Sequence, residues 1–149
     1  MSAPEPWGID IDVVLRDLDA LRHVNNAVYA TYLETARNIY VAELEGRKLS
    51  LEFHFILARQ EIDFRSAAGL GDRLRVSLWP TRLGTKSFDF AYHIRNRDTG
   101  ALVLEALSVQ VAYDYDRQEP RELPADLRQA LERELARGRP AQPGPHSWR

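Results

Sequence analysis

Apolar and polar residues alternate along most of this chain, and a period of two residues predicts β-strands. The alternation holds at 9–15, 56–64, 74–78 and 88–95. Residues 101–115 are apolar on much of both faces of the expected strand, which predicts a strand in the interior of a sheet. Asp98-Thr-Gly100 stands between the last two runs and predicts a hairpin turn. Pro80 and Gly84 are expected to interrupt the stretch that follows residue 78.

The segment 27–45 has a different period and predicts a long helix. Its apolar residues fall three and four positions apart, at Tyr29, Tyr32, Leu33, Ala36 and Tyr40. At 1.5 Å per residue such a helix is roughly 28 Å long, enough to cross a whole sheet. Asn25 and Asn26 are both suitable N-caps, and Gly46 is a suitable C-terminal stop. A shorter amphipathic helix is predicted at 123–137.

The order of these elements is strand, long helix, four strands and short helix. It predicts an α+β fold in which an antiparallel sheet is covered by the long helix. We expect one domain over residues 1–138, a proline-rich disordered tail at 139–149 and a loose N-terminus through Trp7. The short helix cannot cover the second face of the sheet, so a second copy of the chain is the simplest candidate to do so.

Composition narrows the function classes. The 149 residues include 20 Lys and Arg against 22 Asp and Glu, a net charge of −2, which argues against a nucleic-acid binder. The absence of cysteine excludes disulfides, Cys-ligated zinc, iron–sulfur clusters and a Cys nucleophile. His54 and His93 lack a partner at metal-ligand spacing, so no metal site is expected. No apolar run reaches the ~20 residues of a membrane span, and no leader is evident, so we expect a cytoplasmic protein.

Two motifs of other enzyme classes are missing. The chain has no Gly-x-Ser-x-Gly, which disfavours a serine-elbow hydrolase. Gly69-Leu-Gly71 lacks a third glycine and precedes a strand, so it does not predict a dinucleotide-binding loop.

Chemically versatile side chains gather between the first strand and the long helix. They are Asp17, Asp19, His23, Asn25 and Asn26. A helix N-terminus offers unpaired N–H groups and a partial positive charge that can hold an oxyanion, and a nearby carboxylate can act as base or nucleophile. The segment therefore suits acyl transfer or hydrolysis. The alternative is that these residues serve as turn formers and helix caps, and spacing alone leaves both interpretations open.

The string Asp17-Leu-Asp19-Ala-Leu-Arg-His23-Val-Asn-Asn26-Ala-Val-Tyr29, followed by Tyr32-Leu-Glu34-Thr-Ala-Arg37, resembles the signature of hotdog-fold thioesterases. More narrowly, it resembles the 4-hydroxybenzoyl-CoA thioesterase-like group. Gly71-Asp72 and Leu83-Gly84-Thr-Lys86-Ser87 are compatible, and the resemblance covers about residues 8–116. It implies a curved antiparallel sheet wrapped around one long helix. It also implies a homodimer in which two subunits pair their sheets into one continuous sheet, with active sites at the dimer interface; both a dimer and a tetramer of such dimers stay open.

The resemblance also implies roles for individual residues. Asp19 matches the catalytic carboxylate, acting as nucleophile or as general base for water. Asn26 lies where a backbone N–H polarises the thioester carbonyl, Asn25 or His23 would orient the loop or the acyl group, and Tyr29 would line the acyl pocket. Many relatives carry Gly where Arg22 stands; if that position needs a positive φ, Arg there costs roughly 1 kcal/mol or more.

The predicted function is hydrolysis of an acyl-CoA, or of an acyl carrier protein thioester, without metal or redox cofactor. Cations that could meet the phosphates of coenzyme A are Arg82, Lys86, Arg95 and Arg97, which equally suit a solvated sheet edge. The alternative is a hotdog dimer that binds acyl thioesters or a protein without turnover, suggested by Arg22. Some hotdog proteins hydrate enoyl-CoA and use an Asp with a His five residues later. Here His23 follows Asp19 by four residues and Asp17 by six, so enoyl-CoA hydration is disfavoured.

Overall fold

The computed structural model describes residues 5–137, and its elements follow the predicted order. They are β1 (Gly8–Asp12), the 3-10 helix η1 (Leu15–Asp17), α1 (Asn26–Leu44), β2 (Phe55–Phe64), β3 (Arg73–Leu83), β4 (Ser87–Asn96), β5 (Leu102–Asp114), β6 (Glu119–Pro120) and α2 (Ala125–Ala136). The predicted long helix and four consecutive strands are confirmed. The tail at 139–149 lies outside the described residues, so its disorder stays a prediction.

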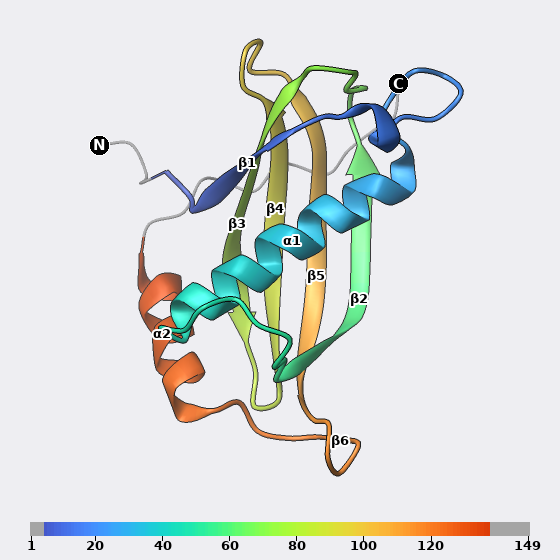
Figure 1. Cartoon of the computed structure of the whole chain (residues 1–149). Coiled ribbons are helices and arrows are strands. Elements are labelled where there is room, and N and C mark those ends of the chain that lie inside the picture. Colours follow the sequence, from blue (N-terminus) through green and yellow to red (C-terminus); the bar gives the residue numbers. More distant parts are fainter. Residues whose placement is uncertain (1–4, 138–149) are drawn as a thin grey trace.

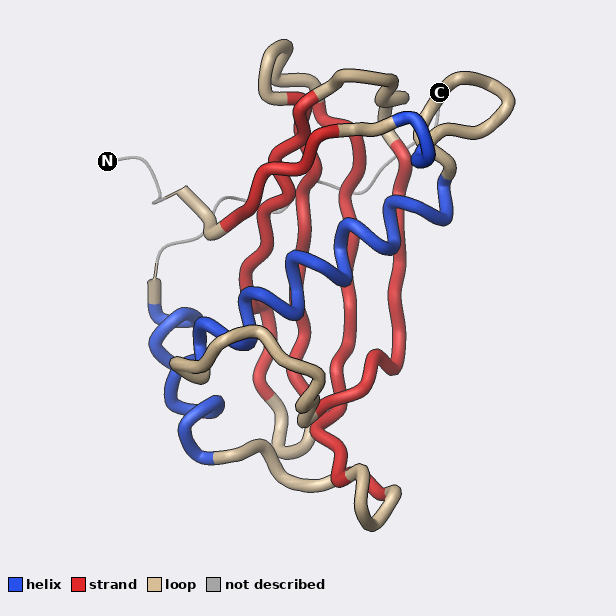
Figure 2. Tube along the Cα trace, viewed as in Figure 1, coloured by secondary structure: helices blue, strands red, loops and turns tan. Residues whose placement is uncertain are grey.

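The strands form one antiparallel sheet in the order β1-β3-β4-β5-β2, with β6 paired to the end of β5. The interior position predicted for 101–115 is confirmed, because β5 lies between β4 and β2. α1 crosses one face of the curved sheet diagonally (Figures 1 and 2). Although β2 precedes β3 in the chain, the two strands lie far apart in the sheet, with β2 forming one edge.

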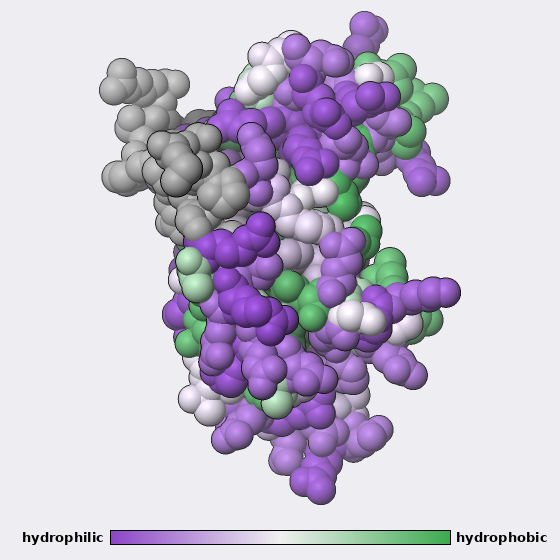
Figure 3. Space-filling model, turned by 90° about the vertical axis from the view of Figure 1, so that its left-hand side faces the viewer, coloured by the Kyte–Doolittle hydropathy of each residue, from purple (hydrophilic) through white to green (hydrophobic). Residues whose placement is uncertain are grey.

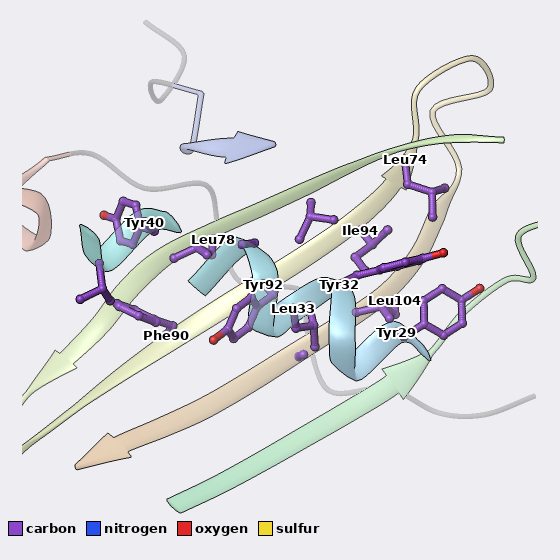
Figure 4. Packing of buried hydrophobic residues seen from close by; sticks show 14 of the residues in the cluster. Tyr29, Tyr32, Leu33, Tyr40, Leu74, Leu78, Phe90, Tyr92, Ile94 and Leu104 are labelled. Atoms are coloured by element: carbon purple, nitrogen blue, oxygen red, sulfur yellow. The ribbon is translucent and has the colours of Figure 1, made fainter. Parts of the chain in front are cut away.

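The core lies between α1 and the inner face of the sheet (Figure 4). Tyr29, Leu33, Ala36 and Tyr40 of α1 are buried there, as the helical spacing predicted. Alternate residues of the strands face them, among them Leu74, Val76, Leu78, Phe88, Phe90, Tyr92, Ile94 and Leu104. Each large apolar side chain buried in this way contributes about 1.5–3 kcal/mol. α2 adds Leu127 and Leu131 to the same cluster.

The prediction of a loose N-terminus through Trp7 is wrong for Trp7 itself. Its indole Nε1 donates a 2.6 Å hydrogen bond to Glu43 of α1, and its ring centre lies 5.0 Å from that of Tyr40. Its carbonyl accepts a 3.0 Å bond from the N–H of Leu78. The prolines restrict only the local backbone, whereas a large aromatic ring is stabilised by burial against apolar residues that are distant in the sequence.

Pro80 does not interrupt β3, contrary to the prediction. The N–H of Leu78 points toward the β1 side and donates a hydrogen bond to the carbonyl of Trp7. Backbone direction alternates along a strand, so the nitrogen of Pro80, two residues later, points to the same side. β1 ends its pairing with β3 at Ser77, so the N–H that Pro80 lacks would meet no strand among residues 5–137. A bulge between Pro80 and Arg82 then adjusts the pairing with β4.

Candidate active site

The loop before α1 folds back on itself. The N–H of Asp19 donates a 2.9 Å bond to the carbonyl of His23, and the N–H of Arg22 donates a 3.0 Å bond to the carbonyl of Asp19. Val24 then donates to the carbonyl of Ala68, which fixes the loop against the end of the sheet. Arg22 closes this turn with φ 65°, the left-handed conformation that favours glycine. Arg22 therefore adopts the left-handed conformation that glycine favours.

The two aspartates of the motif have different surroundings. Oδ2 of Asp17 accepts hydrogen bonds from the N–H of Val14 at 3.0 Å and from the hydroxyl of Tyr32 at 2.8 Å. Oδ1 of Asp19 accepts one 2.8 Å bond from the N–H of Leu21. Its Oδ2 has no hydrogen-bond partner among residues 5–137. Asp17 therefore anchors the loop, whereas Asp19 keeps an oxygen available for a ligand.

The two asparagines at the start of α1 also differ in their hydrogen bonds. Asn25 is the N-cap, with its Oδ1 accepting a 2.9 Å bond from the N–H of Ala27. Asn26 is the first helical residue, and its N–H makes no hydrogen bond within the described part of the chain. Because the helix dipole places partial positive charge here, this N–H is suited to hold an oxyanion.

One pocket of about 320 Å³ gathers four of the predicted residues, Asp19, His23, Asn26 and Tyr29. Its opposite wall is formed by residues 64–67, at the end of β2. Asn25 does not line this pocket and instead caps the helix. No motif in the sequence marks residues 64–67 as functional. They line the pocket because β2 pairs with β5 at the edge of the sheet. The roles of all these side chains stay predictions.

Tyr29 forms an inner wall of this pocket. Its ring centre lies 5.8 Å from that of Phe64, and its hydroxyl accepts a 3.3 Å bond from the N–H of Ala68. Burial raises the pKa of the Tyr29 hydroxyl, so the side chain is neutral at physiological pH. The wall that Tyr29 offers is therefore largely apolar.

The predicted phosphate-binding cations lie outside this pocket. Arg82 makes two 2.9 Å bonds to Asp89, at the β3–β4 turn. Lys86 is exposed at the same turn, which lies at the end of the sheet away from the start of α1 (Figure 1). Arg95 donates to the carbonyl of Gly100, and Arg97 pairs with Asp10. A single chain thus does not bring these cations to Asp19, and phosphate binding stays a prediction.

Residues 5–137 contain no group of three or more His, Asp or Glu side chains placed to hold a metal ion. Neither α1 nor α2 combines the length and apolarity that a membrane-crossing helix requires.

Comparison with known proteins identifies the family. The model of the thioesterase-like superfamily matches residues 13–131. The chain belongs to this superfamily. It is 31% identical over 123 residues to the long-chain acyl-CoA thioesterase FadM of Escherichia coli, covering 77% of this chain and 89% of FadM. It is 25% identical over 111 residues to a 1,4-dihydroxy-2-naphthoyl-CoA hydrolase of Nostoc punctiforme, covering 70% of this chain and 74% of that protein.

A solved thioesterase of the same superfamily has the same fold. The crystal structure of a thioesterase from Thermus thermophilus, complexed with coenzyme A and zinc, is 30% identical. It superposes with a TM-score of 0.75 over 87% of this chain and 94% of its own. The hotdog fold predicted for this thioesterase-like chain is confirmed. The predicted class of enzyme, an acyl-CoA thioesterase, is confirmed at the level of the family.

Proposed function

We propose that this chain hydrolyses an acyl-CoA thioester to a carboxylic acid and coenzyme A, with Asp19 as the catalytic carboxylate. The observation that carries the proposal is that Asp19 and Asn26 line one pocket, the first with an oxygen and the second with an N–H that the described chain leaves unbonded. FadM and the naphthoyl-CoA hydrolase are named for acyl-CoA substrates, which supports coenzyme A as the donor.

In the proposed reaction, the thioester carbonyl oxygen receives a hydrogen bond from the N–H of Asn26. Asp19 then acts in one of two ways. It removes a proton from water, whose oxygen attacks the carbonyl carbon, or it attacks that carbon itself to form an anhydride that water hydrolyses. Both routes pass through a tetrahedral oxyanion that the helix N-terminus stabilises, and both release the thiol.

Turnover of a panel of acyl-CoAs by wild type and by Asp19→Asn tests the proposal. We expect the variant to lose about 10²- to 10⁴-fold in kcat, the usual contribution of a positioned acid or base. Asp17→Asn is the matched control, because it changes the other aspartate of the same loop; it should lower stability and alter kcat much less. Full turnover by Asp19→Asn would show that Asp19 is not the catalyst.

Isotope labelling separates the two routes. In a single turnover in H₂¹⁸O, attack by water on the substrate carbon places the label in the product acid. Attack by Asp19, followed by hydrolysis at its own carboxyl carbon, places the label in the protein. Mass spectrometry that finds the label in the Asp19 peptide therefore establishes attack by Asp19, whereas label in the product acid alone is compatible with both routes, because water can also attack the acyl carbon of the anhydride.

The non-catalytic alternative was suggested by Arg22, since a residue other than glycine could have sent the loop along a different path. Arg22 adopts φ 65°, so the turn does not depend on glycine. Calorimetric binding of acyl-CoA with no thiol release over hours would nevertheless favour that alternative. A higher kcat/KM for the matched acyl carrier protein thioester would assign the carrier protein as donor.

A further inference from the structure

Arg37 of α1 carries a positive charge inside the apolar core. Only 3% of its surface is exposed, and it lies among the buried residues of the helix together with Leu33 and Tyr40. A guanidinium does not lose its proton in a protein. Burying a charge is strongly unfavourable unless an opposite charge and hydrogen bonds compensate for it. The proposed reaction gives Arg37 no role, so its surroundings must show what this buried cation is for.

The described part of the chain does not compensate for the charge of Arg37. Its Nη1 donates a 3.2 Å hydrogen bond to the hydroxyl of Tyr92 on β4. Its Nε is buried and makes no hydrogen bond with residues 5–137, which also offer it no carboxylate as an ion-pair partner. Burial raises the pKa of Tyr92, so the phenol is neutral at physiological pH. Arg37 therefore lacks both an opposite charge and one acceptor.

A chain of polar side chains continues from Tyr92 across the inner face of β5. The Tyr92 hydroxyl lies 2.6 Å from Oγ of Ser108, and Ser108 donates a hydrogen bond to Oε1 of Gln110. Nε2 of Gln110 donates a 3.0 Å bond to the carbonyl of Phe88. Ser108 and Gln110 are almost fully buried. Because all these groups are neutral, the chain adds hydrogen bonds but no negative charge near Arg37.

Gln60 of β2 brings a second unsatisfied group to the same place. It lies directly opposite Ser108 in the pairing of β2 with β5, so the two side chains share the inner face. Its Oε1 is buried and accepts no hydrogen bond within the described structure. Rotation of the carboxamide by half a turn exchanges its oxygen and nitrogen, so Gln60 can also present an N–H there. Arg37, Gln60, Tyr92 and Ser108 together form a polar patch in the apolar core.

The polar patch lies on the same face of β2 as the wall of the pocket that holds Asp19. Phe64 belongs to that wall, and Ile62 and Gln60 follow on the same face at alternate positions. These three residues are only partly buried, whereas their partners on β5, residues 104, 106 and 108, are buried. α1 starts near the end of β2 and crosses toward β3 (Figures 1 and 2). A partly exposed strip of β2 therefore leads from the pocket to the polar patch.

The opposite side of the core is covered. Trp7 packs on Tyr40, and α2 adds Leu127 and Leu131 to the core cluster. The surface on the side of β1 and α2 is mainly hydrophilic (Figure 3). A ligand therefore approaches Arg37 along β2, from the direction of the pocket.

We infer that the polar patch binds a carboxylate at the far end of the acyl group, and that this chain therefore prefers thioesters of dicarboxylic acids. The inference rests on the proposed function, which places the thioester at Asn26. Arg37 lies eleven positions further along α1, a rise of about 16 Å, so a methylene chain separates the thioester from the carboxylate. This methylene chain lies on Ile62 and Phe64.

The carboxylate supplies what the polar patch lacks. It accepts a charge-assisted hydrogen bond from Nε of Arg37 and a further bond from the amide of Gln60, and it provides the missing negative charge. The methyl end of an unsubstituted acyl chain would displace water from both groups and leave them unsatisfied. Sites that are built to hydrogen-bond a ligand reject analogues without the polar group for this reason.

Matched pairs of thioesters test the inference. Each pair contains the coenzyme A monothioester of a dicarboxylic acid and the thioester of the monocarboxylic acid with the same number of carbons, over a series of lengths. We expect wild type to prefer the dicarboxylic member by about 10- to 100-fold in kcat/KM at the best length, as for hydrogen bonds to a charged group. The inference is wrong if kcat/KM for the dicarboxylic member is equal or lower at every length.

Arg37→Met separates recognition of the carboxylate from a structural role. Replacing a buried charge by an apolar side chain of similar volume is commonly neutral or stabilising. We expect the preference to disappear, because the carboxylate loses its partner and the methyl end gains apolar surface. A purely structural role would lower kcat/KM for both members equally, and such an unchanged preference overturns the inference. Arg75→Met is the matched control, because it removes an arginine of β3 that pairs with Asp10, and it should keep the wild-type preference.

Two further measurements make the test independent of the folding of Arg37→Met and of the catalytic proposal. Gln60→Leu, at a partly buried position, should reduce the preference several-fold; an unchanged preference in this variant contradicts the inference. Calorimetry with Asp19→Asn should show tighter binding of the dicarboxylic thioester, because Asp19 is not part of the polar patch. Full turnover by Asp19→Asn refutes the proposed function and leaves the preference measurable. Equal binding of both members by Asp19→Asn refutes the inference and leaves the proposed function standing.

Discussion

The hydroxyl of Tyr32 on α1 donates a 2.8 Å hydrogen bond to Oδ2 of Asp17 in the preceding loop. Burial raises the pKa of Tyr32 and the Asp17 carboxylate raises it further, so the hydroxyl remains a donor at any physiological pH. The bond holds the loop against the helix at the level of the pocket. It also occupies Asp17 and thereby distinguishes this aspartate from Asp19.

Removing this bond should lower stability. We expect Tyr32→Phe to reduce the free energy of unfolding by about 1.5–3 kcal/mol, the usual contribution of a hydrogen bond to a charged group. Tyr29→Phe is the matched control and should cost less, because the Tyr29 hydroxyl accepts a longer bond from a backbone N–H. Urea denaturation measures both. In a double-mutant cycle with Asp17→Asn, additive losses would contradict a direct coupling.

The backbone N–H of Asn26 can be removed with little disturbance of the helix. Proline is favoured at the first helical position, and Asn25 already has the extended conformation, φ −61° and ψ 135°, that a following proline requires. We expect Asn26→Ala to keep most of kcat and Asn26→Pro to lose about 10²- to 10³-fold, as for other oxyanion donors. Circular dichroism would verify the fold of both. Equal kcat values would contradict a role for this N–H.

Arg22 offers a test of backbone strain. A side chain at φ 65° costs about 1–2 kcal/mol, whereas glycine adopts this conformation freely but loses more entropy on folding. We expect Arg22→Gly to raise the free energy of unfolding by up to about 1 kcal/mol. Leu21→Gly, at the exposed neighbour without a positive φ, should instead lower it. A loss of stability in Arg22→Gly would mean that the Arg22 side chain makes a compensating contribution.

His93 should make stability depend on pH. Burial, with a smaller effect of Arg95, lowers the pKa of His93 from 6.5 to about 4. The unfolded chain therefore binds more protons than the folded chain between about pH 4 and 6.5. The free energy of unfolding should be fully present above pH 6.5 and fall as the pH drops through this window. Urea titrations across the window should show a smaller slope for His93→Gln; an unchanged slope would exclude His93 as the source.

Much of this protein could be predicted from local patterns. The period of two residues in the strands and the helical spacing of Tyr29, Leu33 and Tyr40 depend only on neighbours in the chain. The candidate residues Asp19, His23, Asn26 and Tyr29 were recognisable together because they follow one another within a single loop and the first turn of a helix. Short-range geometry then places them around one pocket.

The tertiary structure decided what depends on distant contacts. It paired β2 with β5 rather than with β3, which brought Phe64 and its neighbours to the pocket. It packed Trp7 against α1, and it placed the Tyr32 hydroxyl so that it donates a hydrogen bond to Asp17 rather than to Asp19. Periodicity shows which face of an element is apolar, but the partner of that face is selected by packing across the whole core. A hydrogen bond between residues fifteen positions apart exists only once that packing is complete.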